Sequence, residues 1–124
     1  MKVLIADDDD ELRDLMVLYL SNAGYGVSAH ENDKKAWEAL QKEGADVAVL
    51  DINMPEMDGL ELLDLIRGSE KFQELPVIII TAGARNIDRE TALGRGADMY
   101  LPKPVDYDGL IKHIKSLWEA FGKE

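Results

Sequence analysis

Residues Ala45-Asp46-Val47-Ala48-Val49-Leu50-Asp51 form a short run rich in apolar and β-branched side chains, and the run stops at an aspartate. The stretch that follows, Ile52-Asn53-Met54-Pro55-Glu56-Met57-Asp58-Gly59, has the composition of a loop. The pattern predicts a buried strand over residues 46–50, with Asp51 directly at its carboxyl end. A second apolar run, residues 3–6, is also followed by acidic residues, the four consecutive aspartates 7–10.

Apolar runs and helical patterns alternate along the rest of the chain. Strands are predicted over residues 2–6, 26–30, 46–50, 76–80 and 97–101, and helical spacing recurs between them. The helical stripes are Leu12, Leu15, Met16 and Tyr19; Ala36, Trp37 and Leu40; Leu60, Leu63 and Ile66; Ile87, Ala92 and Leu93; and Leu110, Ile111, Ile114, Leu117, Trp118 and Phe121. Glycines 24, 44 and 96 suit helix C-terminal caps. The rhythm predicts an α/β fold, an open doubly wound five-stranded parallel sheet in one domain over residues 1–124.

Composition narrows the classes of function. The chain has 124 residues, no cysteine, and a net charge of −11 from 14 basic and 25 acidic side chains. Such a charge repels phosphate backbones, so direct binding of nucleic acid by this domain is not expected. No apolar run is long enough to span a membrane, and the first residues do not resemble a signal peptide. The expected location is the cytoplasm.

The predicted strand ends place reactive side chains together. In open parallel sheets, function gathers outside the carboxyl ends of the strands. Those ends carry Asp7 and Asp8, Asp51, Thr81, and Lys103. Converging carboxylates either raise a pKa or bind a cation, and Mg²⁺ prefers oxygen ligands. A carboxylate beside such an ion can attack a phosphoryl group and form an aspartyl phosphate, with a lysine and a threonine near the phosphoryl oxygens.

Each of these residues, taken singly, also has an ordinary structural explanation. Asp9 and Asp10 suit the start of a helix, and Asp7 and Asp8 could do the same. Asp51 could be a turn residue, Thr81 the end of a strand, and Lys103 a surface lysine. Their joint appearance at the ends of several strands favours the functional interpretation.

The chain resembles the receiver domain of two-component response regulators over essentially its whole length. Residues 4–9 are similar to the acidic first-strand motif of that family, and residues 51–59 to its phosphoacceptor loop. Residues 80–82 and 103–104 match the two remaining signatures in order and spacing. The resemblance implies a flavodoxin-like (βα)5 fold with strand order 2-1-3-4-5.

The resemblance also implies roles for individual residues. Asp51 would accept a phosphoryl group from a sensor histidine kinase or a phosphotransfer protein. Asp7 and Asp8 would hold Mg²⁺, together with Asp51 and the backbone carbonyl of Asn53. Thr81 would hydrogen-bond the phosphoryl group, and Lys103 would pair with one of its oxygens. The peptide bond between Lys103 and Pro104 would be cis.

Signalling would follow from a conformational switch. The resemblance implies that Tyr100 turns inward after phosphorylation, together with a movement of Thr81. A downstream protein would bind the face formed by the fourth helix, the fifth strand and the fifth helix. The domain would catalyse its own phosphorylation and dephosphorylation without turning over an external substrate. The chain departs from the family pattern at Val105, where many members carry an aromatic residue, and Pro102 falls at the end of the last predicted strand, where it removes a backbone donor.

Other classes fit the residues less well. A haloacid-dehalogenase-like phosphatase needs a second aspartate at the place of Asn53. An EF-hand Ca²⁺ loop starting at Asp51 fails at Pro55 and at Leu62, where a bidentate glutamate is required. A flavin protein of this layering would meet repulsion between its phosphate and the aspartates 7–10. The sequence leaves open whether the domain acts alone or is the receiver of a longer protein.

Overall fold

The structure is a computed structural model that describes residues 1–52, 59–81 and 86–122. The elements alternate strictly between strand and helix as far as the chain is described. They are β1 (Lys2–Ala6), α1 (Asp10–Asn22), β2 (Gly26–His30), α2 (Asp33–Glu43), β3 (Val47–Asp51), α3 (Gly59–Arg67), β4 (Val77–Thr81), α4 (Asn86–Gly94), β5 (Met99–Pro102), α5 (Tyr107–Leu117) and a terminal π-helical turn, η1 (Trp118–Gly122).

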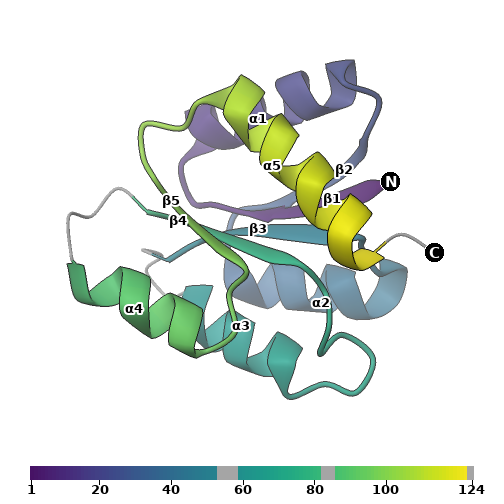
Figure 1. Cartoon of the computed structure of the whole chain (residues 1–124). Coiled ribbons are helices and arrows are strands. Elements are labelled where there is room, and N and C mark those ends of the chain that lie inside the picture. Colours follow the sequence, from purple (N-terminus) through teal and green to yellow (C-terminus); the bar gives the residue numbers. More distant parts are fainter. Residues whose placement is uncertain (53–58, 82–85, 123–124) are drawn as a thin grey trace.

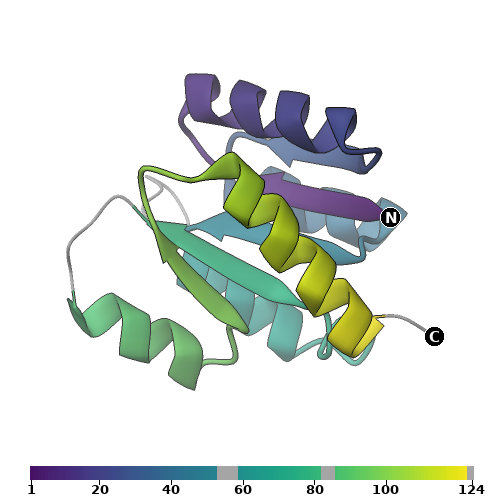
Figure 2. The same cartoon turned by 45° about the horizontal axis from the view of Figure 1, so that its top comes forward.

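The described strands form a single five-stranded sheet in the order β2-β1-β3-β4-β5, and every neighbouring pair is parallel. Helices α1 and α5 cover one face, and α2, α3 and α4 cover the other (Figure 1). The turned view in Figure 2 separates these layers and shows the N-terminus at the end of the sheet where β1 begins. The predicted fold class and strand order are therefore confirmed.

The strand boundaries lie close to the predicted ones. β3 and β4 each run one residue later than predicted, so that Asp51 and Thr81 are the last residues of their strands. β5 begins at Met99, two residues later than predicted. The Asp98 carboxylate accepts a hydrogen bond from the Val77 amide (2.8 Å), so a side chain already takes a backbone donor of β4 there.

Pro102 is accommodated because β5 lies at the edge of the sheet. It pairs in register with Thr81, at the last position of the strand. The next residue, Lys103, donates its backbone N–H to the Thr81 carbonyl at 2.8 Å. A proline that ends an edge strand leaves the rest of the ladder intact, and the chain arrives at Lys103 tied to the end of β4.

Two apolar clusters lie on the two faces of the sheet. The central strands β1, β3 and β4 supply most of the fully buried side chains. The cluster under α2, α3 and α4 includes Leu40, Leu63 and Ile66, and the cluster under α1 and α5 includes Leu110 and Ile114. Nearly continuous apolar strands follow from this two-sided burial.

The buried face of α1 differs from the predicted stripe. Met16 and Leu20 are buried, whereas Leu15 and Tyr19 are 36% and 41% exposed. The inward line of α1 therefore runs one residue further along the chain, with Leu12 only partly buried. Tyr19 stacks instead on Tyr107 of α5, with ring centroids 4.7 Å apart and planes at 7°. The prediction was wrong for Tyr19 because its ring has the spacing of a buried residue but packs on α5 outside the core.

The other helical stripes hold in most positions. In α5, Leu110, Ile114 and Leu117 are buried, and in α4 Ala92 is buried while Leu93 is 39% exposed. The side chains of Ile87 and Phe121 lie outside the described residues. The predicted cap glycines at 24, 44 and 96 all have positive φ, at 94°, 73° and 108°. None of the helices in the described part of the chain has both the length and the apolar character that crossing a bilayer requires.

The amino ends of β4 and β5 are tied together by Arg67, the last residue of α3, whose side chain is 20% exposed. Its guanidinium donates to the carbonyls of Gly96 (2.9 Å), Leu75 (2.7 Å) and Gln73 (3.2 Å) and to the Asp98 carboxylate (3.0 Å). Gly96 has φ of 108°, and a Cβ there would lie 2.9 Å from Arg67 Nε. Glycine is thus required for both the backbone and the guanidinium. We call Arg67, Asp98 and these acceptors the amino-edge network.

Candidate functional site

Two buried carboxylates meet at the carboxyl edge of the sheet. β1 and β3 are parallel neighbours whose register pairs Ala6 with Leu50, so the residues that follow, Asp7 and Asp51, lie level with each other. Asp7 is fully buried and Asp51 is 2% exposed. Asp8 is exposed, yet it offers a carboxylate oxygen to the same place. One ligand oxygen from each of the three lies within 4.8 Å of the others.

A lysine reaches the two buried carboxylates from the edge of the sheet. Lys103 Nζ lies 3.1 Å from Asp51 Oδ2 and 3.3 Å from Asp7 Oδ2. Its side chain is 15% exposed. Burial lowers the pKa of Lys103, but the hydrogen bond to Asp51 and the charges of Asp51 and Asp7 outweigh this, so that its pKa is raised. The ammonium therefore remains charged. We call Asp7, Asp8, Asp51 and Lys103 the carboxyl-edge cluster.

The pKa of the Asp7 carboxyl group is raised in this cluster. Burial, and to a lesser degree the charge of Asp51, raise the pKa of Asp7 to about 6, against the lowering effects of a hydrogen bond from Asp9 and of Lys103. Asp7 Oδ1 accepts the Asp9 amide at 2.9 Å. Buried Oδ2 has only the ion contact with Lys103 among the described residues.

The donor set suits a hard divalent cation. Three carboxylates face one ammonium, which leaves an excess of negative charge when all are ionised. Such clusters favour a cation, and Mg²⁺ is commonly held by one or two carboxylates and several waters. The exposed position of Asp8 gives the site access to solvent. Asn53, whose backbone carbonyl was a predicted ligand, lies outside the described residues.

The remaining predicted residues occupy the same edge or the adjoining strand. Thr81 is fully buried at the end of β4, between the strands that lead to Asp51 and Lys103. Tyr100 lies on β5, partly buried against the cluster under α2, α3 and α4. The Lys103–Pro104 peptide bond is cis, as predicted.

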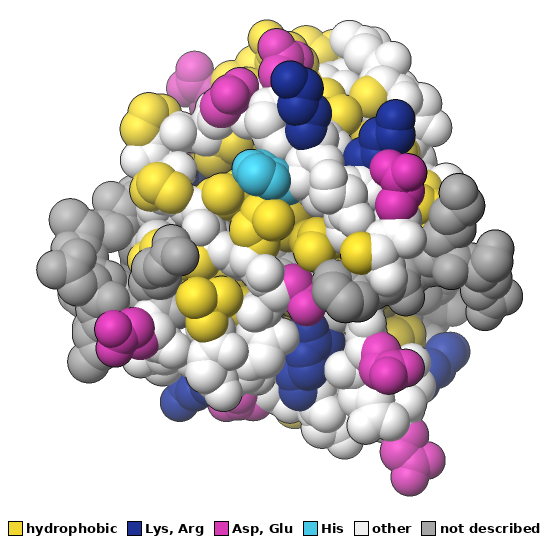
Figure 3. Space-filling model, in the orientation of Figure 1, with side chains coloured by type: hydrophobic (Ala, Val, Ile, Leu, Met, Phe, Trp, Pro, Cys, Tyr) yellow, Lys and Arg dark blue, Asp and Glu magenta, His cyan; other side chains and the backbone are white. Residues whose placement is uncertain are grey.

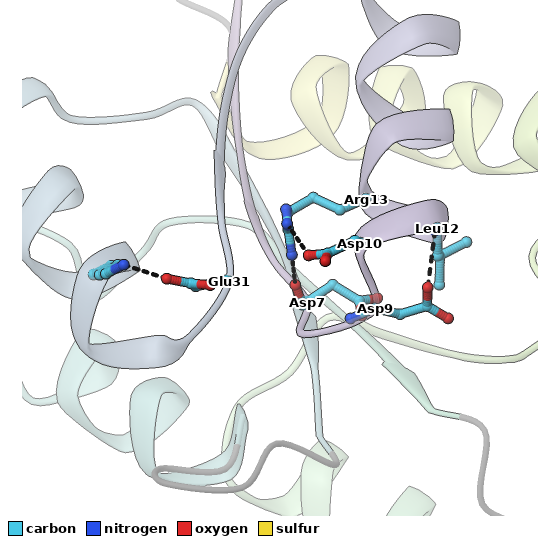
Figure 4. Close-up of polar contacts among 7 residues, drawn as sticks. Asp7, Asp9, Asp10, Leu12, Arg13 and Glu31 are labelled. Atoms are coloured by element: carbon cyan, nitrogen blue, oxygen red, sulfur yellow. Dashed lines mark hydrogen bonds and ion pairs between the residues drawn. The ribbon is translucent and has the colours of Figure 1, made fainter.

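Sequence reasoning missed an arginine that contacts this site from α1. Arg13 Nη1 donates to the Asp7 carbonyl at 2.7 Å, and Nη2 pairs with Asp10 (Figure 4). Asp9 is the N-cap of α1, since its carboxylate accepts the Leu12 amide at 3.1 Å. The spacing of Asp10 and Arg13 was a visible signal of a helical ion pair. The contact with the backbone of Asp7 had no such signal.

Two hollows adjoin the last strand. One, of about 430 Å³, lies beside the site and is lined by Asp9, Leu12, Lys103, Pro104, Val105 and Tyr107. The other, of about 220 Å³, lies between β5 and α5 and is lined by Leu101, Pro102, Pro104, Val105, Asp106, Gly109, Leu110 and His113. Figure 3 shows apolar side chains gathered beside a histidine on this face of the molecule.

Comparison with known proteins finds relatives in sequence and in fold. Residues 3–115 match the family model described as the response regulator receiver domain. The chain is 41% identical over 121 residues to an uncharacterised 14.6 kDa protein of Leptolyngbya boryana, covering 98% of this chain and 92% of that protein. It is 38% identical over 115 residues to the transcriptional regulatory protein GltR of Pseudomonas aeruginosa, covering 93% of this chain and 48% of GltR. The chain thus spans about half the length of that regulator.

Solved structures give the same result. The chemotaxis protein CheY4 of Vibrio cholerae superposes with a TM-score of 0.88 at 28% sequence identity. The superposition covers 94% of this chain and 97% of that protein. The two proteins therefore share one fold over nearly the whole length of both chains.

Proposed function

The chain belongs to the response regulator receiver domain family of two-component systems, and from this premise we propose that it accepts a phosphoryl group on Asp51. The donor is a phosphohistidine of a sensor histidine kinase or of a phosphotransfer protein. The observation that carries the proposal is the contact of buried Asp51 with Lys103, beside two further carboxylates that can hold a cation.

The chemistry is a transfer between two nucleophiles. A carboxylate oxygen of Asp51 attacks phosphorus, the P–N bond to the donor imidazole breaks, and the imidazole leaves with the bonding electron pair and takes up a proton. Asp7, Asp8 and Asp51, with the carbonyl of Asn53, would hold Mg²⁺. The bound ion supplies positive charge to the phosphoryl oxygens as they approach the carboxylates.

Lys103 and Thr81 bind the phosphoryl group after its transfer to Asp51. In the unphosphorylated protein the Lys103 ammonium lies against Asp51 and Asp7. An aspartyl phosphate brings additional negative charge, so Lys103 pairs with a phosphoryl oxygen after transfer. Thr81, at the end of the neighbouring strand, hydrogen-bonds another oxygen. These contacts exist only in the phosphorylated state and therefore supply the free energy that shifts the conformation.

The conformational shift changes the surface formed by α4, β5 and α5. Tyr100 turns further inward as Thr81 moves, and a downstream protein binds the altered surface. The hollow between β5 and α5 and the apolar side chains gathered on this face (Figure 3) support this choice, because exposed apolar surface favours protein partners. The protein acts in the cytoplasm as a signalling module and catalyses its own phosphorylation and dephosphorylation. It binds neither nucleic acid nor membrane through this domain.

The test is phosphorylation by acetyl phosphate in the presence of Mg²⁺, followed by mass spectrometry of the intact protein. Wild type gains one phosphoryl group, and Asp51→Asn gains none at that position. Asp14→Asn is the matched control, because Asp14 is an exposed carboxylate of α1 that is not one of the three converging carboxylates, and it is labelled like wild type. Labelling of Asp51→Asn to the wild-type extent would falsify the assignment of the nucleophile.

A further inference from the structure

We propose that Arg13 is a positioning residue that holds the turn carrying Asp7 and Asp8 in its metal-binding geometry. The inference rests on the proposed function in one respect, since it takes these aspartates as the ligands of a divalent cation. It goes beyond that function because it assigns the order of the ligand turn to a side chain outside the cluster.

The contacts of Arg13 identify it as a clamp on this turn. Its side chain is only 17% exposed, although it belongs to the first turn of α1. Nη1 donates to the Asp7 carbonyl at 2.7 Å, a short bond of the kind that a charged donor makes. Nη2 pairs with Asp10, so the guanidinium joins the start of the turn to the start of the helix (Figure 4).

The turn is bonded internally, but its outer side depends on Arg13. The Asp7 amide donates to the His30 carbonyl of β2 at 3.1 Å, which continues the sheet by one residue. The Asp9 amide donates to Asp7 Oδ1 at 2.9 Å, and this fixes the carboxylate so that Oδ2 faces Lys103. The Asp7 carbonyl lies between these bonds and is held by Arg13. Release of that carbonyl frees the peptide that leads to Asp8.

If Arg13 acts by positioning the ligands, its removal weakens Mg²⁺ binding. If it acts only through its charge, its removal strengthens Mg²⁺ binding. Arg13 is a cation close to a place where another cation would bind. If its charge alone mattered, its removal would tighten Mg²⁺ binding, by at most about fivefold across a solvent-exposed turn. If it orders the ligands, its removal weakens binding by about tenfold, the lower end of the effect seen when groups that orient metal ligands are lost.

The experiment measures the Mg²⁺ dissociation constant of the whole chain by calorimetric titration, without any phosphodonor. Arg13→Met is expected to weaken binding about tenfold. Arg13→Lys keeps the charge but lacks the planar fork that contacts two acceptors, and its binding is expected to lie between wild type and Arg13→Met. Asp10→Asn stays within about twofold of wild type, because Asp10 is 82% exposed.

A control variant and a second measurement distinguish disorder of the ligand turn from a general loss of folded structure. Arg95→Met makes the same chemical change at an exposed ion pair with Asp64 (3.7 Å) and leaves Mg²⁺ affinity unchanged. In the metal-free protein, hydrogen exchange of the Asp9 amide is expected to accelerate about tenfold in Arg13→Met, while the amides of β3 keep their protection. Circular dichroism checks the fold, and Arg13→Lys carries the test if the methionine variant is unfolded.

Equal or tighter Mg²⁺ binding by Arg13→Met overturns the proposal, and so does wild-type affinity in Arg13→Lys. Unchanged exchange at Asp9 also contradicts it. These results are distinct from failure of the proposed function. A wild-type protein that binds Mg²⁺ but is not phosphorylated would refute the phosphoryl-acceptor assignment and leave the Arg13 result standing.

Discussion

The two edges of the sheet combine arginine or lysine with carboxylates in opposite ways. In the amino-edge network, the guanidinium of Arg67 meets four acceptors, and the Asp98 carboxylate that balances its charge also receives the Val77 amide. In the carboxyl-edge cluster, the ammonium of Lys103 contacts Asp51 and Asp7, and Asp8 adds a third carboxylate to the same place. The first edge is balanced in charge and in hydrogen bonds. The second is not, and it is therefore the edge that can respond to a cation or a phosphoryl group.

The difference concerns how free energy is distributed within one sheet. Burial of a charge is unfavourable unless partners satisfy it. The amino-edge network meets this condition and stabilises the folded state. The carboxyl-edge cluster meets it only in part, as the raised pKa of Asp7 indicates, and strongly shifted groups of this kind are typical of functional sites. Substitutions at the two edges should consequently change stability with opposite signs.

The largest effect is expected at the amino edge. Arg67→Met removes the donor to three carbonyls and leaves Asp98 without its cation, so the free energy of unfolding should fall by about 3 kcal/mol. Urea denaturation monitored by circular dichroism measures it. Arg95→Met, at an exposed ion pair, is the control and should stay within about 0.5 kcal/mol of wild type. A loss as small as that of the control would show that the amino-edge network contributes little to stability.

A smaller effect of opposite sign is expected at the carboxyl edge. In metal-free buffer at pH 7, Asp7→Asn should raise the free energy of unfolding by about 2 kcal/mol, because it removes a buried charge beside Asp51. Burial raises the pKa of Asp7 from 3.8 to about 6. The folded state thus holds this proton more tightly than the unfolded state. The contribution of Asp7 to the free energy of unfolding should therefore decline as pH rises from about 4 to about 6, so that wild type loses stability relative to Asp7→Asn over this range.

The outcome that contradicts this prediction is a loss of stability in metal-free Asp7→Asn. Such a loss would mean that the ion contact with Lys103 outweighs the burial of Asp7. Asp14→Asn is again the matched control, since it removes an exposed carboxylate from α1. It should shift the unfolding free energy by no more than about 0.5 kcal/mol and leave its pH dependence unchanged.

The sequence predicted the carboxyl edge far better than the amino edge. The strands and the polar residues at their ends are visible as apolar runs that stop in Asp7, Asp51 and Thr81, and parallel pairing brings such ends together. Arg67 could not be recognised in this way. Most of its acceptors are backbone carbonyls, up to 29 residues away along the chain, and a carbonyl has no sequence signature.

Two further differences come from contacts that residue spacing does not reveal. The α1 stripe included Tyr19, but hydrophobic spacing cannot tell a ring that enters the core from one that stacks on a neighbouring helix. Arg13 was missed because its main acceptor is the carbonyl of Asp7. The roles assigned to Asp51, Thr81 and Lys103 stay predictions, and the ligand role of Asn53 falls outside the described residues.

The smallest of the three effects tests whether the charge imbalance is the property that a cation relieves. Mg²⁺ at about ten times its dissociation constant should stabilise wild type by about 1.4 kcal/mol, since it binds only the folded state. Asp8→Asn should lose most of this gain at the same Mg²⁺ concentration, because Asp8 contributes one of the three converging carboxylates. Thermal unfolding with and without Mg²⁺ measures both.

Asp14→Asn should retain the full gain, and Arg67→Met should as well, despite its lower starting stability, because Arg67 lies at the opposite edge of the sheet from the three converging carboxylates. An equal gain in Asp8→Asn and wild type would place the cation away from the carboxyl-edge cluster and remove the functional meaning of the contrast between the two edges.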